Sequence, residues 1–178
     1  MELTAALLDL CKSTARPIIA IDGPAGAGKT TLAEHLSVAL SLKYKCTTLH
    51  MDDLYNGWDT PFDHHLSDAL VGASRAHQNS QTLSLSRFNW STGQYGPATE
   101  LPKSDLLILE GVGSSQVSVR PYLTASIWID IEPDAGLERV LRRDGDSISQ
   151  QMQRWLTMQA EHFRDNDSQN AADFVLSN

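Results

Sequence analysis

Gly23-Pro24-Ala25-Gly26-Ala27-Gly28-Lys29-Thr30 matches the pattern G-x-x-x-x-G-K-[ST] at every fixed position. The stretch follows an apolar run, residues 17–21, and precedes a helical pattern that begins at Thr31. Strand, glycine-rich loop and helix in this order are the context in which the pattern binds phosphate groups. A chance glycine-rich turn is the alternative, and the matching flanks argue against it. The stretch therefore predicts an α/β fold built around a site for a nucleoside triphosphate.

The residue types in this loop suit phosphate chemistry. Glycine has no Cβ, so its backbone can turn N–H groups inward toward a phosphate. Together with the N-terminus of the next helix, those groups form an anion-binding nest. We expect Lys29 to reach the β- and γ-phosphates, and the Thr30 hydroxyl to bind Mg²⁺ with Thr31 beside it. The expected ATP-binding residues are Gly23, Pro24, Ala25, Gly26, Ala27, Gly28, Lys29, Thr30 and Thr31.

Composition limits the classes of protein and partner. At 178 residues we expect a single domain over 1–178. The net charge of −8 argues against nucleic acid or an anionic membrane as a partner, because either would need a basic face. No apolar run reaches the roughly 20 residues of a membrane span, and the first residues do not form a signal peptide. We therefore expect a cytoplasmic protein, and its oligomeric state stays open.

Strand and helix patterns alternate along the chain. Predicted strands cover 17–22, 46–51, 105–109, 126–130 and 172–176. Predicted helices cover 2–14, 31–43, 64–79, 137–143 and 148–163, and 81–102 is expected to be a loop or short hairpin. This alternation predicts βαβ units and a mostly parallel sheet flanked by helices.

Acidic side chains follow two of the predicted strands. In open parallel sheets, ligands bind beyond the carboxyl ends of the strands. Glu110 after one strand suits a Mg²⁺ site opposite Thr30, with a turn cap as the alternative. Asp52 after another suits a base that deprotonates an acceptor hydroxyl, with an N-cap pair as the alternative. We expect Asp53 to point the other way along an extended strand end.

A basic segment follows later in the chain. Arg139 and Arg143 share one helix face, and such cations stabilise charge on a transferring phosphoryl group. The alternative is a solvated stripe that pairs with Glu138 and Asp144. Because Gly145 follows the basic segment, residues 139–150 are expected to form a closing lid.

These motifs together resemble the uridine kinase and phosphoribulokinase group of P-loop kinases. The group has a glycine loop, a strand ending D-S-F-Y, a strand ending E-G and an arginine-rich lid. Here residues 23–30, 52–55, 110–111 and 139–144 are similar to those four motifs. The resemblance implies a P-loop NTPase fold with a five-stranded parallel sheet in the order 2-3-1-4-5. It also implies that Asp52 is the general base.

The resemblance also implies an acceptor site. Tyr55 matches a substrate-contacting tyrosine, Asp63 matches an aspartate that binds sugar hydroxyls, and Phe88 and Trp90 lie where the group lines a base pocket. Asn89 replaces an acidic residue of the group, and the second arginine pair of the lid is missing after Asp144. Nearby carboxylates such as Asp59 and Asp68 would repel a phosphorylated acceptor, so a nucleoside is favoured over a nucleotide. A nucleoside monophosphate kinase and an ATPase acting on a partner protein stay open as alternatives.

Overall fold

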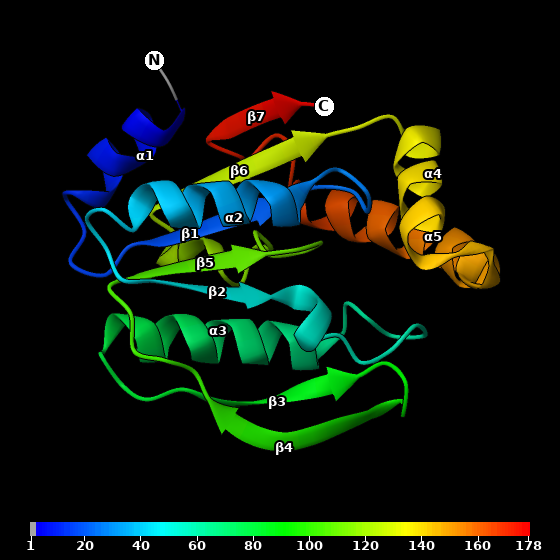
Figure 1. Ribbon diagram of the computed structural model, residues 1–178, viewed down its shortest axis with the longest axis horizontal. Helices are drawn as coiled ribbons and strands as arrows, with labels where there is room; N and C mark the ends of the chain where they lie inside the picture. The colour runs from blue at the N-terminus through cyan, green and yellow to red at the C-terminus, as the bar shows by residue number, and fades with distance from the viewer. Residues whose placement is uncertain (1–2) are drawn as a thin grey trace.

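The central sheet has five parallel strands with the glycine loop leaving its middle strand (Figure 1). The computed structural model describes residues 3–178, so the first residue of the predicted helix 2–14 lies outside them. Across the sheet the strands are β2 (Cys46–His50), β5 (Leu106–Glu110), β1 (Ile18–Asp22), β6 (Ala125–Asp130) and β7 (Phe174–Ser177). This is the predicted order 2-3-1-4-5, and the expected P-loop fold is confirmed.

The strand register brings three strand ends to one edge of the sheet. All residues of β1 and β5 are buried, as expected for central strands covered on both faces. Glu110 at the end of β5 lies opposite Ile21 of β1 on one side and His50 of β2 on the other. The segments that follow β1, β2 and β5 therefore begin next to one another at this edge of the sheet.

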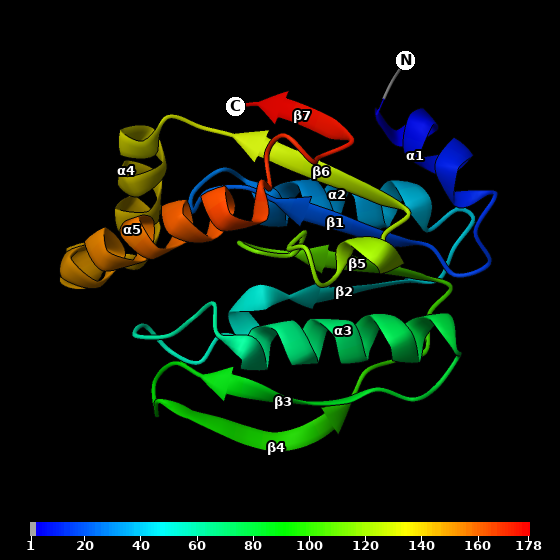
Figure 2. The same cartoon turned by 180° about the vertical axis from the view of Figure 1, so that it is seen from behind.

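Helices cover both faces of the sheet (Figures 1 and 2). Alternate strand residues such as Ile19 and Ile108 pack with α1 (Leu3–Cys11) and α2 (Lys29–Leu40). Their neighbours, such as Ile18 and Leu107, pack with α3 (His64–Gln78) and α5 (Ser149–Asn166). Within residues 3–178 no helix is both long and apolar enough to cross a membrane.

The segment expected to be a loop or hairpin forms a separate antiparallel pair. Its strands are β3 (Ser84–Asn89) and β4 (Gln94–Glu100), with an irregularity between Ser86 and Phe88. The hairpin lies beyond α3, on the far side from the main sheet (Figure 1). Its tip returns toward the carboxyl edge of the sheet, because the Trp90 indole N–H donates to the carbonyl oxygen of Asp52 at 2.9 Å.

One local prediction is wrong. Residues Met51–Asp53 form a 3₁₀ turn, η1, and not the extended strand end that was expected. The turn closes because the Leu54 N–H donates to the Met51 carbonyl oxygen at 2.8 Å. Asp52 and Asp53 therefore diverge because the chain turns between them, and not through strand alternation.

The expected lid segment comprises α4 (Pro133–Asp144), the short 3₁₀ turn η3 (Asp146–Ile148) and the start of α5. Another short 3₁₀ turn, η2 (Arg120–Tyr122), precedes β6. The first half of α4 packs against the glycine loop, backbone to backbone. A Cβ at Gly136 would lie 2.6 Å from the Ala25 carbonyl oxygen, and one at Gly26 would meet the backbone of Gly136. Glycine at both positions permits this close approach.

This contact predicts opposite effects for two helical glycines. Gly136→Ala should destabilise the fold by about 1 kcal/mol or more, because overpacking outweighs the gain in helix propensity. Gly72→Ala, in α3 with open space around it, should stabilise by about 0.4–1 kcal/mol. Urea unfolding of both variants measures the difference. Equal stabilisation by both would show that α4 does not pack on the loop.

Candidate active site

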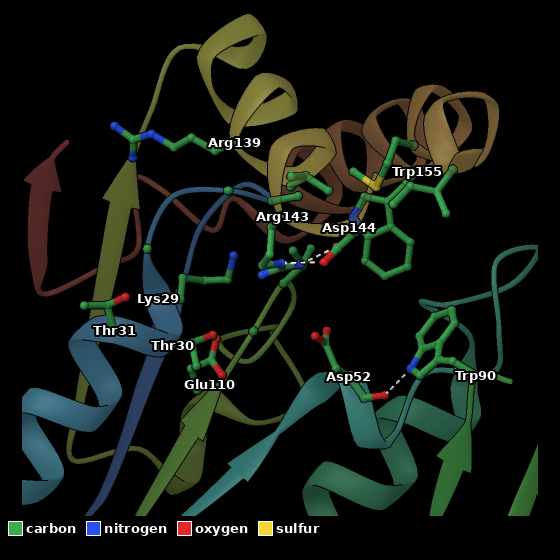
Figure 3. Close-up of a pocket in the computed structure, with 18 of the residues that line it drawn as sticks. Lys29, Thr30, Thr31, Asp52, Trp90, Glu110, Arg139, Arg143, Asp144 and Trp155 are labelled. Carbon is green, nitrogen blue, oxygen red and sulfur yellow. Dashed lines mark hydrogen bonds and ion pairs between the residues drawn. The ribbon is translucent and has the colours of Figure 1, made fainter. Parts of the chain in front are cut away.

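A cavity of about 620 Å³ opens at the carboxyl ends of the strands (Figure 3). The glycine loop and the start of α2 form one side, η1 and Trp90 form the opposite side, and α4 and α5 cover it. Pockets of roughly 300–1,000 Å³ are typical of small-molecule sites. The location is the one at which open parallel sheets bind ligands.

The start of α2 supplies cationic and N–H groups to the cavity. Lys29 is buried, and its ammonium donates to the Pro24 carbonyl oxygen at 2.8 Å. Burial lowers the pKa of Lys29, while the nearby carboxylates of Glu110 and Asp22 oppose that shift. The first-turn N–H groups of a helix have no intrahelical acceptor. A triphosphate would supply acceptors to those groups and anionic charge to Lys29, so the residues present fit it.

The loop is fastened by contacts from distant parts of the chain. The Ala25 N–H donates to Gln159 Oε1 of α5 at 3.2 Å, and Asn178 Nδ2 donates to the Ala27 carbonyl oxygen at 2.8 Å. Both contacts come from the C-terminal third of the chain. Because these residues lie far from the loop in the sequence, no local sequence pattern predicts the contacts.

Asp22, which the motif analysis passed over, joins two loops of the site. Its Oδ1 accepts from the N–H groups of Gly23 at 2.8 Å and Gly113 at 2.9 Å. Its Oδ2 accepts from the Ser115 N–H at 3.0 Å and the Ser115 hydroxyl at 2.7 Å. The carboxylate is buried, and these donors satisfy it. It therefore fixes the glycine loop relative to the segment that follows Glu110.

Thr30 and Glu110 meet at the corner expected to hold Mg²⁺. The Thr30 hydroxyl donates to Glu110 Oε1 at 3.1 Å, and His50 Nδ1 lies 2.7 Å from Glu110 Oε2. The hydrogen bond to Glu110 raises the pKa of His50. A hydroxyl beside a carboxylate offers the oxygen ligands that Mg²⁺ prefers, so these residues fit the ion. Thr31 lines the cavity nearby.

The two neighbouring aspartates have different surroundings. The Asp52 carboxylate faces the cavity (Figure 3), and desolvation by the cavity walls raises its pKa. Glu110 raises that pKa further, whereas Lys29 and Arg143 lower it. Asp53 turns away and pairs with Arg87, whose Nη1 lies 3.0 Å from Asp53 Oδ2. Of these two aspartates, only Asp52 is placed to act on a molecule in the cavity.

Two of the three α4 arginines line the cavity. Arg139 and Arg143 both line it, but the Arg139 guanidinium extends toward the end of β6, whereas Arg143 lies near Lys29 (Figure 3). Arg143 makes a bidentate pair with Asp144, with both N–O distances 2.7 Å. The hydrogen bond to Asp144 raises the pKa of Arg143, and Asp52 and Glu110 add to the shift. Arg142 pairs with Glu138 on the outer side of the helix. The structure therefore brings Arg143 to the side of the cavity that holds Lys29, with Arg139 at its rim.

Two predicted acceptor-binding residues are engaged elsewhere. Tyr55 is fully buried, and its hydroxyl donates to the Val112 carbonyl oxygen at 2.8 Å. Asp63 caps α3, because its Oδ1 accepts from the N–H groups of His65 and Leu66 at 3.0 and 3.3 Å. Neither Tyr55 nor Asp63, the expected substrate-contacting residues, lines the cavity. A motif match cannot distinguish a ligand-binding Asp from a helix cap.

The aromatic wall differs from the expected one. Trp90 lines the cavity as predicted, but Phe88 lies in a separate shallow groove of the hairpin, beside Asp53 and Arg87. Trp58 and Trp155 complete the wall instead. The sequence predicts Trp58 as part of a flat apolar wall with Tyr55, Phe88 and Trp90, whereas Trp155 is expected only on the apolar face of a helix.

The fold is that of P-loop kinases of the uridine kinase and phosphoribulokinase type. The expected resemblance is confirmed at the level of the fold. No protein-family model matches the sequence, and no curated protein matches it.

Solved kinase structures align over the whole chain. A possible uridine kinase from Bacillus stearothermophilus has a TM-score of 0.67 at 22% identity, covering 99% of this chain and 100% of the other. A candidate fructose transport system kinase from Silicibacter sp. TM1040 has a TM-score of 0.74 at 16% sequence identity, and the alignment covers 98% of each chain. D-glycerate 3-kinase from Cryptococcus neoformans has a TM-score of 0.66 at 13% sequence identity, and the alignment covers 98% of this chain and 93% of the other. At these identities the likeness establishes the fold.

The metal corner yields a prediction for Glu110. Glu110→Gln should raise the Mg²⁺ concentration needed for half-maximal ATP turnover by about tenfold or more, because an anionic oxygen is lost without a change of shape. Glu138→Gln, an exposed change on α4 outside the cavity, is the matched control. The measurement is ATP turnover against MgCl₂ at fixed ATP. An unchanged Mg²⁺ requirement in Glu110→Gln would remove Glu110 from the metal site.

Proposed function

We propose that the protein transfers the γ-phosphoryl group of Mg-ATP to a hydroxyl of a small molecule. One observation carries the proposal: the Asp52 carboxylate faces the buried Lys29 and the Arg143 guanidinium across the cavity (Figure 3). Cations at one side suit the phosphates, and a carboxylate at the other suits the acceptor O–H. Because ATP is supplied in the cytoplasm, we keep the cytoplasm as the proposed location.

The residues divide the work of transfer between them. Lys29, Arg139 and Arg143 would hold the phosphate oxygens and balance their charge. Asp52 would accept the proton of the acceptor hydroxyl as the new O–P bond forms and ADP leaves with the electrons of the broken bond. Mg²⁺ held by Thr30 and Glu110 would supply further neutralisation of phosphate charge. The cover from α4 and α5, which includes the apolar side chains of Val140, Met152 and Trp155, would limit the access of water.

The resemblance implies a nucleoside as the acceptor. Trp90 on the cavity wall supports a flat ring there. Tyr55 and Asp63, which would complete the nucleoside site, are held by Val112 and by the start of α3. We therefore state the acceptor as a ring-bearing alcohol, with nucleosides included in the test.

A nucleoside monophosphate kinase has less support. A phosphorylated acceptor needs arginines beyond those that hold ATP. Arg87 and Arg75 do not line the cavity: Arg87 is paired with Asp53, and Arg75 donates to the Tyr122 hydroxyl at 2.7 Å. An ATPase acting on a partner protein would release phosphate to water, so the fate of the γ-phosphoryl group separates it from the proposal.

The adjacent aspartates give an internal control for catalysis. Asp52→Asn should retain ATP binding and lose transfer by about 10²–10⁴-fold, the usual contribution of one acid–base group. Asp53→Asn should change transfer much less, because Asp53 is turned toward Arg87. Calorimetric ATP binding and product formation are measured for both variants. Comparable losses in the two variants would show that Asp52 is not the base.

The raised pKa of Asp52 predicts a pH profile. The ionised carboxylate is the active form, so kcat/KM should rise with pH and fall as pH drops through the pKa. Because the pKa lies above that of an ordinary aspartate, the loss should begin at a higher pH than usual. Asp52→Asn should remove this acidic limb. The same limb in wild type and Asp52→Asn would assign it to another group.

A further inference from the structure

Tryptophan side chains dominate the acceptor side of the cavity. Three of the chain's four tryptophans line it: Trp58 from the loop before α3, Trp90 from the hairpin and Trp155 from α5. Figure 3 shows Trp90 and Trp155 on the Asp52 side, across the cavity from Lys29. Segments far apart in the sequence therefore build one wall.

The indole rings form a continuous surface. The ring centroids of Trp58 and Trp90 are 5.1 Å apart, and those of Trp58 and Trp155 are 5.8 Å apart, both in edge-to-face geometry. Ile148 and Met152 extend this surface along the lid. Aromatic and aliphatic walls of this kind favour the faces and edges of a flat, apolar ring.

This side of the cavity offers few groups that could bind hydroxyls. The Trp90 N–H is used by the Asp52 carbonyl oxygen, and the Asp144 carboxylate is held by Arg143. Within residues 3–178 the buried Trp155 N–H has no acceptor, so it is one donor that a ligand oxygen could use. Among the cavity-lining residues on the acceptor side, Asp52 is the carboxylate that is left to accept from an alcohol.

An acceptor rich in hydroxyls would fit this wall poorly. Each hydroxyl that is buried against indole or aliphatic carbon loses its hydrogen bonds to water without replacement. Asp63, the residue expected to accept from sugar hydroxyls, is committed to the N–H groups of α3. A nucleoside sugar would therefore find a partner for its reacting hydroxyl but not for its diol.

We infer that the acceptor is a small, flat aromatic or heteroaromatic alcohol, of which Asp52 binds the single reacting hydroxyl. This inference rests on the proposed phosphoryl transfer. The alcohol O–H gives its proton to Asp52, its oxygen bonds to the γ-phosphorus of ATP, and the bond from that phosphorus to ADP breaks. The products are an aromatic alkyl phosphate and ADP.

A panel of acceptors tests the chemical class. The probes are 3-pyridinemethanol and 5-(hydroxymethyl)pyrimidine as ring alcohols, uridine and 2′,3′-dideoxyuridine as a matched pair, and glycerol and D-ribose as polyols. With Mg-ATP, kcat/KM for the ring alcohols should exceed that for the polyols by about tenfold or more. Removing the diol from uridine should change kcat/KM by less than about threefold. A polyol that surpasses the ring alcohols, or a larger loss with dideoxyuridine, would overturn the inference.

Substitutions at Trp58 test the wall. Trp58→Leu should raise KM for the ring alcohol by about tenfold while KM for ATP stays unchanged, and Trp58→Phe should restore much of the loss. Trp128→Phe is the control, because Trp128 is buried in β6 and lies outside the cavity. An equal rise in both KM values for Trp58→Leu, or no rise in either, would contradict the assignment.

A readout without ATP separates this inference from the proposed function. Titration with 3-pyridinemethanol in the absence of nucleotide should change tryptophan fluorescence in wild type and Trp128→Phe, and the change should weaken in Trp58→Leu. Wild type that shows this change but neither binds nor cleaves Mg-ATP would refute the proposed function alone. Wild type that binds Mg-ATP and phosphorylates only polyols would refute this inference alone.

Discussion

The buried carboxylate of Asp22 is the constraint on which the site depends. It ends the central strand β1 and accepts four hydrogen bonds, from Gly23, Gly113 and Ser115. A buried carboxylate without such donors would be strongly destabilising. Because one donor lies in the glycine loop and three lie in the segment after Glu110, satisfying Asp22 fixes both loops at once. The glycine loop and the metal corner therefore have one common anchor.

Further hydrogen bonds fix the residues around Asp22. Thr30 and His50 hold the two oxygens of Glu110, and Gln159 and Asn178 hold the glycine loop. Next to Glu110 in space, the η1 turn points the side chains of Asp52 and Asp53 in different directions. The Asp52 carboxylate lies in the cavity, and the Asp53 carboxylate is paired with Arg87. The helix α4 packs on the loop at Gly136 and carries Arg143 to the side of the cavity that holds Lys29, with Arg139 at its rim. The positions of cation and base thus follow from backbone packing.

The sequence predicts the structure well where a local pattern has a direct physical cause. The glycine loop, the apolar strands and the acidic strand ends predict a parallel sheet and the meeting of Thr30 with Glu110, whereas the strand order comes from the resemblance to P-loop kinases. Prediction is limited where one residue type serves two purposes, since an aspartate such as Asp63 caps a helix or binds a ligand with the same local sequence. The sequence also does not show that Tyr55 is fully buried with its hydroxyl on the Val112 carbonyl oxygen.

Other features depend on contacts between remote residues. Asp22 bonds across 91 and 93 positions to Gly113 and Ser115, and His50 meets Glu110 across 60. Trp58, Trp90 and Trp155 come together only when the loop, hairpin and last helix are folded. A single sequence indicates Trp58 and Trp90 as parts of an apolar wall, but the contribution of Trp155 is evident only from the structure.

The central claim is that the γ-phosphoryl group passes from ATP to an alcohol bound beside Asp52. The most direct measurement incubates the protein with Mg²⁺, γ-¹⁸O-labelled ATP and a ring alcohol, and follows the label by mass spectrometry. The account predicts labelled phosphoryl on the alcohol oxygen, formed together with ADP and lost in Asp52→Asn. Label recovered only as inorganic phosphate, with the alcohol unchanged, would contradict the account.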